Sequence, residues 1–201
     1  MVSPLVSRPA FTAPNAALPE TQTAASRTGI ELRARRYEVL QIASRHGRAS
    51  VARHFETAFG LDLPPLGQRF ASGSRAVLCV SPGKWLAMEA DPGAPRLDEL
   101  GRALAGKAAM TCQSDALAFI EVSGPTIEAF MEKCAAIDLH PEKFPTGSAT
   151  ATLVALMRCY LSRLDDAPTF ELAVARSTAD SLLAHLTNAA RSFGFSFTPS
   201  S

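Results

Sequence analysis

A five-residue motif occurs twice in this chain, once in each half of the sequence. Leu-Asp-Leu-Pro-Pro occupies 61–65, and Ile-Asp-Leu-His-Pro occupies 137–141. Each copy follows a segment whose apolar spacing predicts an amphipathic helix, 48–59 in the first half and 124–136 in the second. A motif that recurs at equivalent positions indicates an internal duplication, and it favours an architectural role for the motif over a catalytic one.

The order of the expected elements supports this duplication. The apolar patterns predict six strands, at 37–44, 75–81, 84–89, 116–123, 150–164 and 169–176. They predict four helices, at 48–59, 96–106, 124–136 and 177–194. The resulting order is β-α-β-β-α twice. We therefore predict an α+β fold of two similar halves, each a largely antiparallel sheet with helices on one face, at 29–108 and 109–201.

The first 28 residues differ in composition from the rest. Four evenly spaced prolines, Pro4, Pro9, Pro14 and Pro19, exclude a helix or a central strand there. Residues 1–28 are therefore expected to form a flexible or extended N-terminal arm. The arm either stays a loose tail or becomes ordered on a partner, since it carries a few apolar side chains that could be buried.

Composition excludes several classes of function. The net charge is +1, which gives no general reason to expect nucleic-acid binding. The four cysteines are far apart, so neither a zinc site nor a disulfide framework is expected, and we interpret them as ordinary buried thiols: Cys79, Cys112, Cys134 and Cys159. No apolar run approaches the ~20 residues of a membrane span. These features favour a cytoplasmic protein.

No catalytic constellation stands out. The sequence contains neither GxSxG nor a nucleotide-binding glycine loop. His140 is suggestive, because Asp138 lies two residues away and could orient the imidazole. The alternative is that Asp138 accepts hydrogen bonds from local backbone donors and His140 lies at a surface. We expect the alternative, and we expect no catalytic, cofactor-binding or metal-binding residue in this chain.

The second half resembles a known family. The specific segments are Asp-Leu-His-Pro…Phe-Pro-x-Gly (138–147), Arg-Leu-Asp-Asp…Thr-Phe-Glu-Leu (163–172) and the Arg-Ser pair at 176–177. Ser-Gly-Pro at 123–125 and Ser-Pro-Gly-Lys-Trp-Leu at 81–86 are weaker matches. Together they resemble the gamma subunit of heterotetrameric sarcosine oxidases, across most of residues 37–194.

This resemblance implies an accessory, non-catalytic subunit. The family's complex oxidatively demethylates sarcosine to glycine, with tetrahydrofolate as one-carbon acceptor and hydrogen peroxide as a product. The resemblance implies no cofactor in this chain; FAD, FMN, NAD and tetrahydrofolate belong with the alpha and beta subunits, and zinc with the delta subunit. It also implies the duplicated fold of folate-binding aminomethyltransferases. A stand-alone folate-binding module or one-carbon transferase is the alternative.

The segment His-Pro-Glu-Lys-Phe-Pro at 140–145 is a candidate docking surface. Phe144 lies there between charged residues and proline, on an expected loop. An exposed aromatic residue on such a loop would suit a partner subunit. The alternative is that Phe144 packs beneath its own loop.

Overall fold

The structure is a computed structural model that describes residues 10–11, 29–91, 93–94 and 96–200. The expected N-terminal arm therefore lies outside the described residues, except for Ala10 and Phe11. Phe11 is buried in the core of the second half of the chain.

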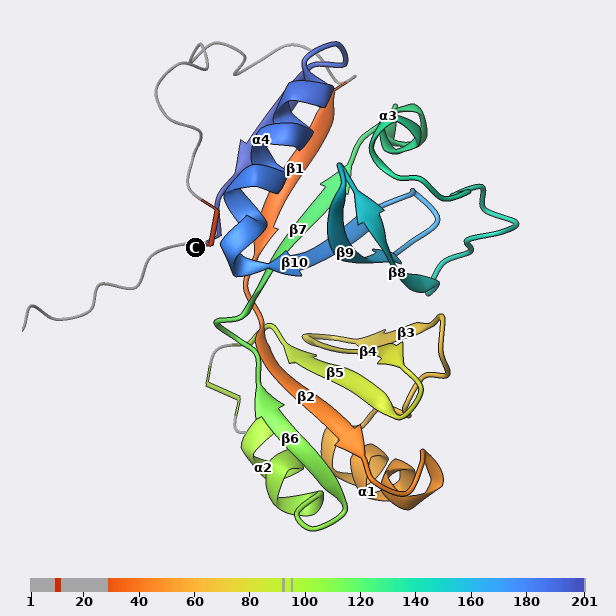
Figure 1. The fold of residues 1–201 in the computed structure, drawn as a ribbon, viewed down its shortest axis with the longest axis vertical. Helices are drawn as coiled ribbons and strands as arrows, with labels where there is room; N and C mark the ends of the chain where they lie inside the picture. The colour runs from red at the N-terminus through yellow and green to blue at the C-terminus, as the bar shows by residue number, and fades with distance from the viewer. Residues whose placement is uncertain (1–9, 12–28, 92, 95, 201) are drawn as a thin grey trace, which may run out of the picture.

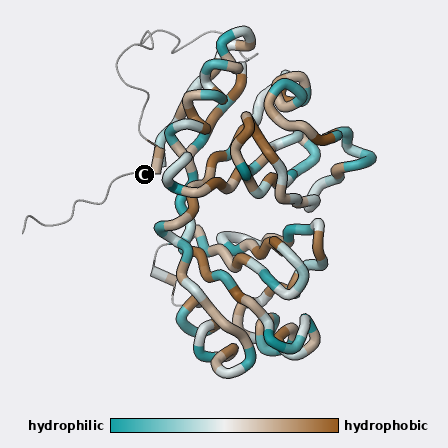
Figure 2. Tube along the Cα trace, viewed as in Figure 1, coloured by the Kyte–Doolittle hydropathy of each residue, from teal (hydrophilic) through white to brown (hydrophobic). Residues whose placement is uncertain are grey.

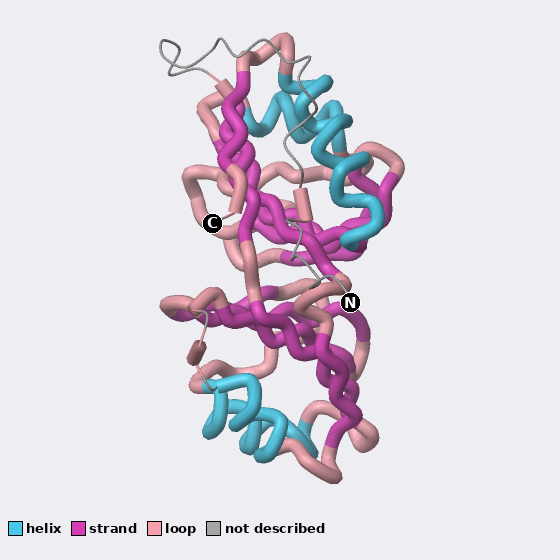
Figure 3. Tube along the Cα trace, turned by 90° about the vertical axis from the view of Figure 1, so that its left-hand side faces the viewer, coloured by secondary structure: helices cyan, strands magenta, loops and turns pink. Residues whose placement is uncertain are grey.

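Two sheets pack against each other through one face each, and helices cover the opposite faces (Figures 1 and 3). The five-stranded sheet has the order β3(Arg69–Ser72), β4(Arg75–Ser81), β5(Lys84–Glu89), β2(Glu38–Ser44), β6(Ala108–Cys112). The six-stranded sheet has the order β11(Phe195–Thr198), β1(Ile30–Arg35), β7(Leu117–Ser123), β10(Phe170–Ala175), β9(Met157–Arg163), β8(Ala149–Val154). The four helices are α1(Ala49–Phe59), α2(Arg96–Ala103), α3(Ile127–Cys134) and α4(Ala179–Ala190), the last preceded by a 3-10 turn at Arg176–Thr178. The predicted α+β class with antiparallel sheets is confirmed.

The same topology occurs twice. The first unit runs β2-α1-β3-β4-β5-α2-β6, and the second runs β7-α3-β8-β9-β10-α4-β11. Their sheet orders coincide once β1 is removed from between β7 and β11. Each unit thus contains more strands than the predicted β-α-β-β-α. The segment predicted as one strand at 150–164 is a hairpin of β8 and β9, because Ala155 and Leu156 turn the chain with positive φ values of 49° and 65°.

The expected boundaries at 29–108 and 109–201 do not separate the two sheets. β1 belongs to the six-stranded sheet of the second unit, where it pairs with β7 and β11. β6 completes the five-stranded sheet of the first unit by pairing with β2. From Ile30 the chain thus runs through one sheet, crosses at Arg36 and Tyr37 into the other, and returns after β6. Pairing between segments that are distant in the sequence, rather than a local pattern, determines to which sheet β1 and β6 belong.

Apolar side chains form three cores. One lies between α1, α2 and the five-stranded sheet, around Phe55, Phe59 and Trp85. A second lies between α3, α4 and the six-stranded sheet. The third joins the two sheets and includes Val39 and Met88. Figure 2 shows many of the most hydrophobic residues along the strands. Because both faces of each sheet are covered, the strands β4, β5, β7 and β10 are buried on both sides.

A second repeated motif joins the two units. Pro-x-Gly-x occurs at 65–68 and at 145–148, and in each copy the proline carbonyl accepts a hydrogen bond from the amide three residues on. Gly67 and Gly147 have φ values of 88° and 83°, which a type II turn requires at that position. The two turns pair with each other: the Arg69 amide donates to Gly147 and the Ala149 amide to Gly67. Equivalent residues of the duplication thus meet where the two units join.

Candidate functional site: a buried ion cluster and the adjoining cleft

Two glutamates lie opposite each other on the face of the six-stranded sheet that turns toward the other sheet. Glu121 in β7 and Glu171 in β10 are direct partners in the antiparallel register. Two like charges in such a pair destabilise a sheet unless cations offset them. Arg35 of β1 and Arg69 of β3 supply these cations, one to each carboxylate. Together with Tyr37, these four residues form what we call the ion cluster.

Glu171 is engaged on both oxygens by its own chain. The Tyr37 hydroxyl donates a hydrogen bond of 2.8 Å to Oε2, and the Arg69 Nε lies 3.3 Å from Oε1. The Arg69 contact is an ion pair whose angle falls outside hydrogen-bond geometry. Glu171 is only 3% exposed, so this end of the cluster is closed to solvent. Burial, followed by the Glu171 charge, raises the pKa of Tyr37 well above its ordinary value.

Glu121 lies closer to solvent than Glu171. The Arg35 Nε lies 3.2 Å from its Oε1, and both side chains are partly exposed. Burial is the main cause that raises the pKa of the Glu121 carboxyl, and Glu171 adds to it, while the Arg35 guanidinium opposes the shift. The cluster therefore changes from a closed ion pair at Glu171 to a partly exposed one at Glu121.

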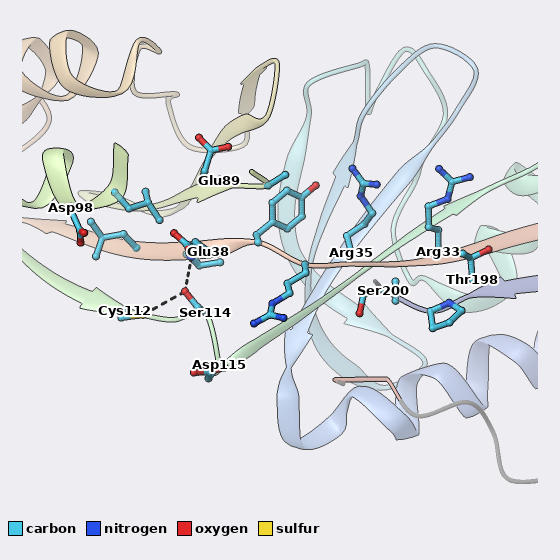
Figure 4. A pocket seen from close by; sticks show the side chains of 18 residues that line it. Arg33, Arg35, Glu38, Glu89, Asp98, Cys112, Ser114, Asp115, Thr198 and Ser200 are labelled. Carbon is cyan, nitrogen blue, oxygen red and sulfur yellow. Dashed lines mark hydrogen bonds between the residues drawn. The ribbon is translucent and has the colours of Figure 1, made fainter. Parts of the chain in front are cut away.

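The open side of the cluster borders a cleft of about 890 Å³ where β1 crosses into β2. Three arginines line it, Arg33, Arg35 and Arg36, and the side chains of Arg33 and Arg35 point to the same side (Figure 4). Figure 4 shows that the carboxylates lie mainly on the side of the five-stranded sheet. Those carboxylates belong to Glu38, Glu89, Asp98 and Asp115. The cleft offers charges of both signs to a polar ligand.

The structure assigns structural positions to the residues that the sequence singled out. The Asp138 Oδ1 accepts from the backbone amide of His140 at 3.0 Å, so this carboxylate satisfies a local donor, as expected, and does not orient the imidazole. Leu139 is buried in the core of the second unit. Phe144 is only 7% exposed and packs in the same core, so its proposed role as an exposed docking residue is wrong.

The cysteines are not all alike. Cys79 and Cys159 are buried and Cys134 is half-buried, as interpreted from the sequence, but Cys112 is exposed at the end of β6. Burial raises the pKa of the Cys134 and Cys159 thiols to about 11. Among the described residues, no group of three or more potential ligands could hold a metal ion. No helix in the described part of the chain is long and apolar enough to cross a membrane.

The sequence analysis missed the ion cluster. Tyr37 and Glu171 are separated by 134 positions, and no local pattern links them. One signal was available: Glu121 and Glu171 each interrupt an otherwise apolar strand, in Leu-Ala-Phe-Ile-Glu-Val and Phe-Glu-Leu-Ala-Val. A carboxylate within a strand that is buried on both faces needs a partner. That signal indicates a buried ion pair but does not identify its cation.

Comparison with known proteins places this fold among solved structures. A chain of heterotetrameric sarcosine oxidase from Corynebacterium sp. U-96 matches with a TM-score of 0.73 and 24% identity, over 84% of this chain and 87% of that chain. The glycine cleavage system aminomethyltransferase T from Bartonella henselae matches with a TM-score of 0.64 and 12% identity, over 86% of this chain and 48% of that chain. The likeness to both is a likeness of fold.

Sequence comparison identifies the family. No sequence among the curated proteins matches the chain. The model of the sarcosine oxidase gamma subunit family matches residues 46–192, which is well over half of the sequence. The match includes the repeated motif at 137–141, both Pro-x-Gly turns and the strand that carries Glu171. The chain therefore belongs to the sarcosine oxidase gamma subunit family.

Proposed function

We propose that this chain is a non-catalytic, structural subunit of a heterotetrameric sarcosine oxidase. The complex would demethylate sarcosine oxidatively to glycine, with tetrahydrofolate as one-carbon acceptor and hydrogen peroxide as product. The family match across residues 46–192 carries this proposal. The fold shared with a chain of a heterotetrameric sarcosine oxidase supports it.

The ion cluster is consistent with a structural role. Glu171, its most buried acid, already binds Tyr37 and Arg69. The rings of Tyr37 and Phe119 pack edge to face at 4.9 Å, and both are buried. These groups therefore satisfy one another and join the sheets rather than present a reactive carboxylate to a substrate.

The flavins, NAD, tetrahydrofolate and zinc would then be held by the other subunits. The alpha, beta and delta subunits are the proposed partners, and the cytoplasm is the proposed compartment. In this account the chain contributes surface and rigidity to the assembly. In this proposal it supplies no group to the redox step.

Co-expression tests this proposal directly. The tagged chain should be produced together with the polypeptides encoded beside it, and the purified material should be weighed by native mass spectrometry. We expect one copy of this chain in a complex of four different subunits that carries flavin absorbance. Recovery of the chain alone, although the other subunits are soluble in the same cells, would contradict the proposal.

A folate-binding module remains the second candidate, and one observation favours it. The fold is shared with aminomethyltransferase T, and the lining of the cleft near the ion cluster includes carboxylates and the aromatic residue Tyr37. Against this, the rings of Tyr37 and Phe119 pack edge to face and are both buried, so neither is presented to a pterin. Isothermal titration of the isolated chain with tetrahydrofolate separates the two candidates. Saturable binding that is lost in Arg35→Ala would favour the folate module.

A further inference from the structure

The outer edge of β8 has the features of an incomplete sheet. β8 is the last strand of the six-stranded sheet; β9 is its neighbouring strand, and the last residue of β8, Val154, also bridges Ala135. Its two ends are fixed on the outer side, where the Ala149 amide donates to Gly67 and the Ala155 amide donates to Cys134. Hydrogen bonding alternates along an antiparallel pair, so the backbone groups of Ala151 and Leu153, between these ends, also point away from β9. Ala151 is therefore left with its N–H and C=O directed away from β9, without a hydrogen-bond partner among the described residues.

The exposed large apolar side chains of the described residues follow this same edge. They are Leu66, Leu153 and Leu156, with 60%, 49% and 90% of their surface exposed. Leu66 directly precedes Gly67, which binds the start of the strand. Leu153 lies near the end of β8, and Leu156 lies at the tip of the β8–β9 hairpin, which is brown in Figure 2. We call this row, together with Ala151, the β8 edge.

The β8 edge lacks the usual protection against pairing with other chains. Natural edge strands carry charges, prolines or bulges that prevent such pairing. Here no charged residue occurs between Lys143 and Arg158, and β8 itself contains neither proline nor glycine. The register with β9 is regular over the whole strand. The exposed edge positions of β6 and β11, by contrast, include the polar residues Thr111 and Ser196.

The hairpin tip adds backbone strain to this exposure. Ala155 and Leu156 both have left-handed backbone conformations, with φ of 49° and 65°. Glycine and asparagine are the residues that usually occupy such turns. A leucine is unfavourable at this position because its backbone has a left-handed conformation and because its apolar side chain is exposed to solvent. The exposed Leu156 side chain makes no contact with the described residues that would stabilise the folded chain. A contact with another chain is therefore the physical explanation for a leucine at this position.

We infer that the β8 edge is the docking surface for another subunit of the complex, which would add an extended segment to the six-stranded sheet. This inference rests on the proposed function and specifies its interface. The segment would pair with the free groups of Ala151 and carry uncharged, apolar side chains at alternate positions. Leu156 would enter an apolar pocket of that subunit. Backbone pairing would supply affinity, and the leucines would supply specificity.

Two substitutions in one turn separate docking from folding. Leu156→Asn and Ala155→Asn both place asparagine, which tolerates positive φ, in the strained turn. Each should therefore keep or raise the melting temperature of the isolated chain, by about 2–4 °C where strain is relieved. Only Leu156→Asn removes the exposed leucine. The affinity of the Leu156→Asn variant for the other subunits should fall by about 10- to 30-fold, the range for loss of a central apolar anchor. The Ala155→Asn variant should assemble like the wild type.

The edge itself is tested by Leu153→Lys, with Thr111→Lys on the exposed edge strand β6 as the matched control. The readout is the amount of flavin-containing complex recovered with the tagged chain. Loss with Leu153→Lys and full recovery with Thr111→Lys is the expected result. Wild-type recovery with both Leu153→Lys and Leu156→Asn would overturn the inference while leaving the proposed function intact.

Failure of the wild-type chain to assemble would contradict the proposed function instead. A wild-type chain that forms homodimers dissolved by Leu153→Lys would also overturn it, since the occupant would then be a second copy.

Discussion

Replacing Glu171 with alanine removes the carboxylate that joins the two sheets. In the native chain this side chain is 3% exposed, accepts from Tyr37 at 2.8 Å and lies 3.3 Å from the Arg69 Nε. Glu171→Ala leaves the Arg69 charge and the Tyr37 hydroxyl buried without their partner. Breaking a buried ion pair from one side typically costs about 3–5 kcal/mol. For a chain of this size, that corresponds to a melting temperature lower by about 6–20 °C.

Urea unfolding of the isolated chain measures the free energy of unfolding that Glu171→Ala loses. Two further variants serve as comparisons. Arg35→Ala breaks the partly exposed pair with Glu121 and should cost no more than about 1 kcal/mol. The triple replacement Tyr37→Phe, Arg69→Met, Glu171→Leu removes all polar groups together and should be more stable than Glu171→Ala alone. A loss below about 1 kcal/mol for Glu171→Ala, or a triple variant less stable than the single one, would refute this view of the cluster.

Three further predictions concern single positions. Leu139→Ala should lower the free energy of unfolding by about 2–4 kcal/mol, because the side chain fills the core, whereas His140→Ala should change it little; urea unfolding measures both. The pKa of Glu121 is raised in the folded chain, so its contribution to stability is complete below the ordinary glutamate pKa and is lost as the pH rises through the raised value. Glu121→Gln should flatten the fall of stability across that interval, and an unchanged pH profile would contradict the assignment. Alkylation followed by mass spectrometry should label the exposed Cys112 quickly and the buried Cys159, whose pKa is about 11, only after unfolding.

Local features of the fold were predictable because their signals are local. Pro82-Gly83 predicted the turn between β4 and β5, and Gly83 has the positive φ of 74° that such a turn uses. The apolar spacing of Val51, Phe55 and Phe59 predicted α1, and all three residues are buried. The repeated Asp-Leu pair, at 62–63 and 138–139, correctly indicated the duplication. In these cases a few neighbouring residues determine the conformation.

Other features depend on contacts between distant residues. The turn at Ala155 and Leu156 contains no glycine, asparagine or proline, so nothing in the sequence divided 150–164 into two strands. The placement of β1 in the second sheet depends on its pairing with β7 and β11, far along the chain. Phe144 illustrates a third limit: its charged neighbours suggested exposure, but the ring packs inward.

Sarcosine-dependent production of hydrogen peroxide tests the central claim most directly, because it reports whether this chain serves a complex or acts by itself. The measurement compares the isolated chain, the other subunits expressed without it, and the full set. We predict no peroxide from the isolated chain, little or no flavin-containing complex without it, and restored activity when it is present. Turnover of sarcosine by the isolated chain, or equal activity of the other subunits in its absence, would contradict the account.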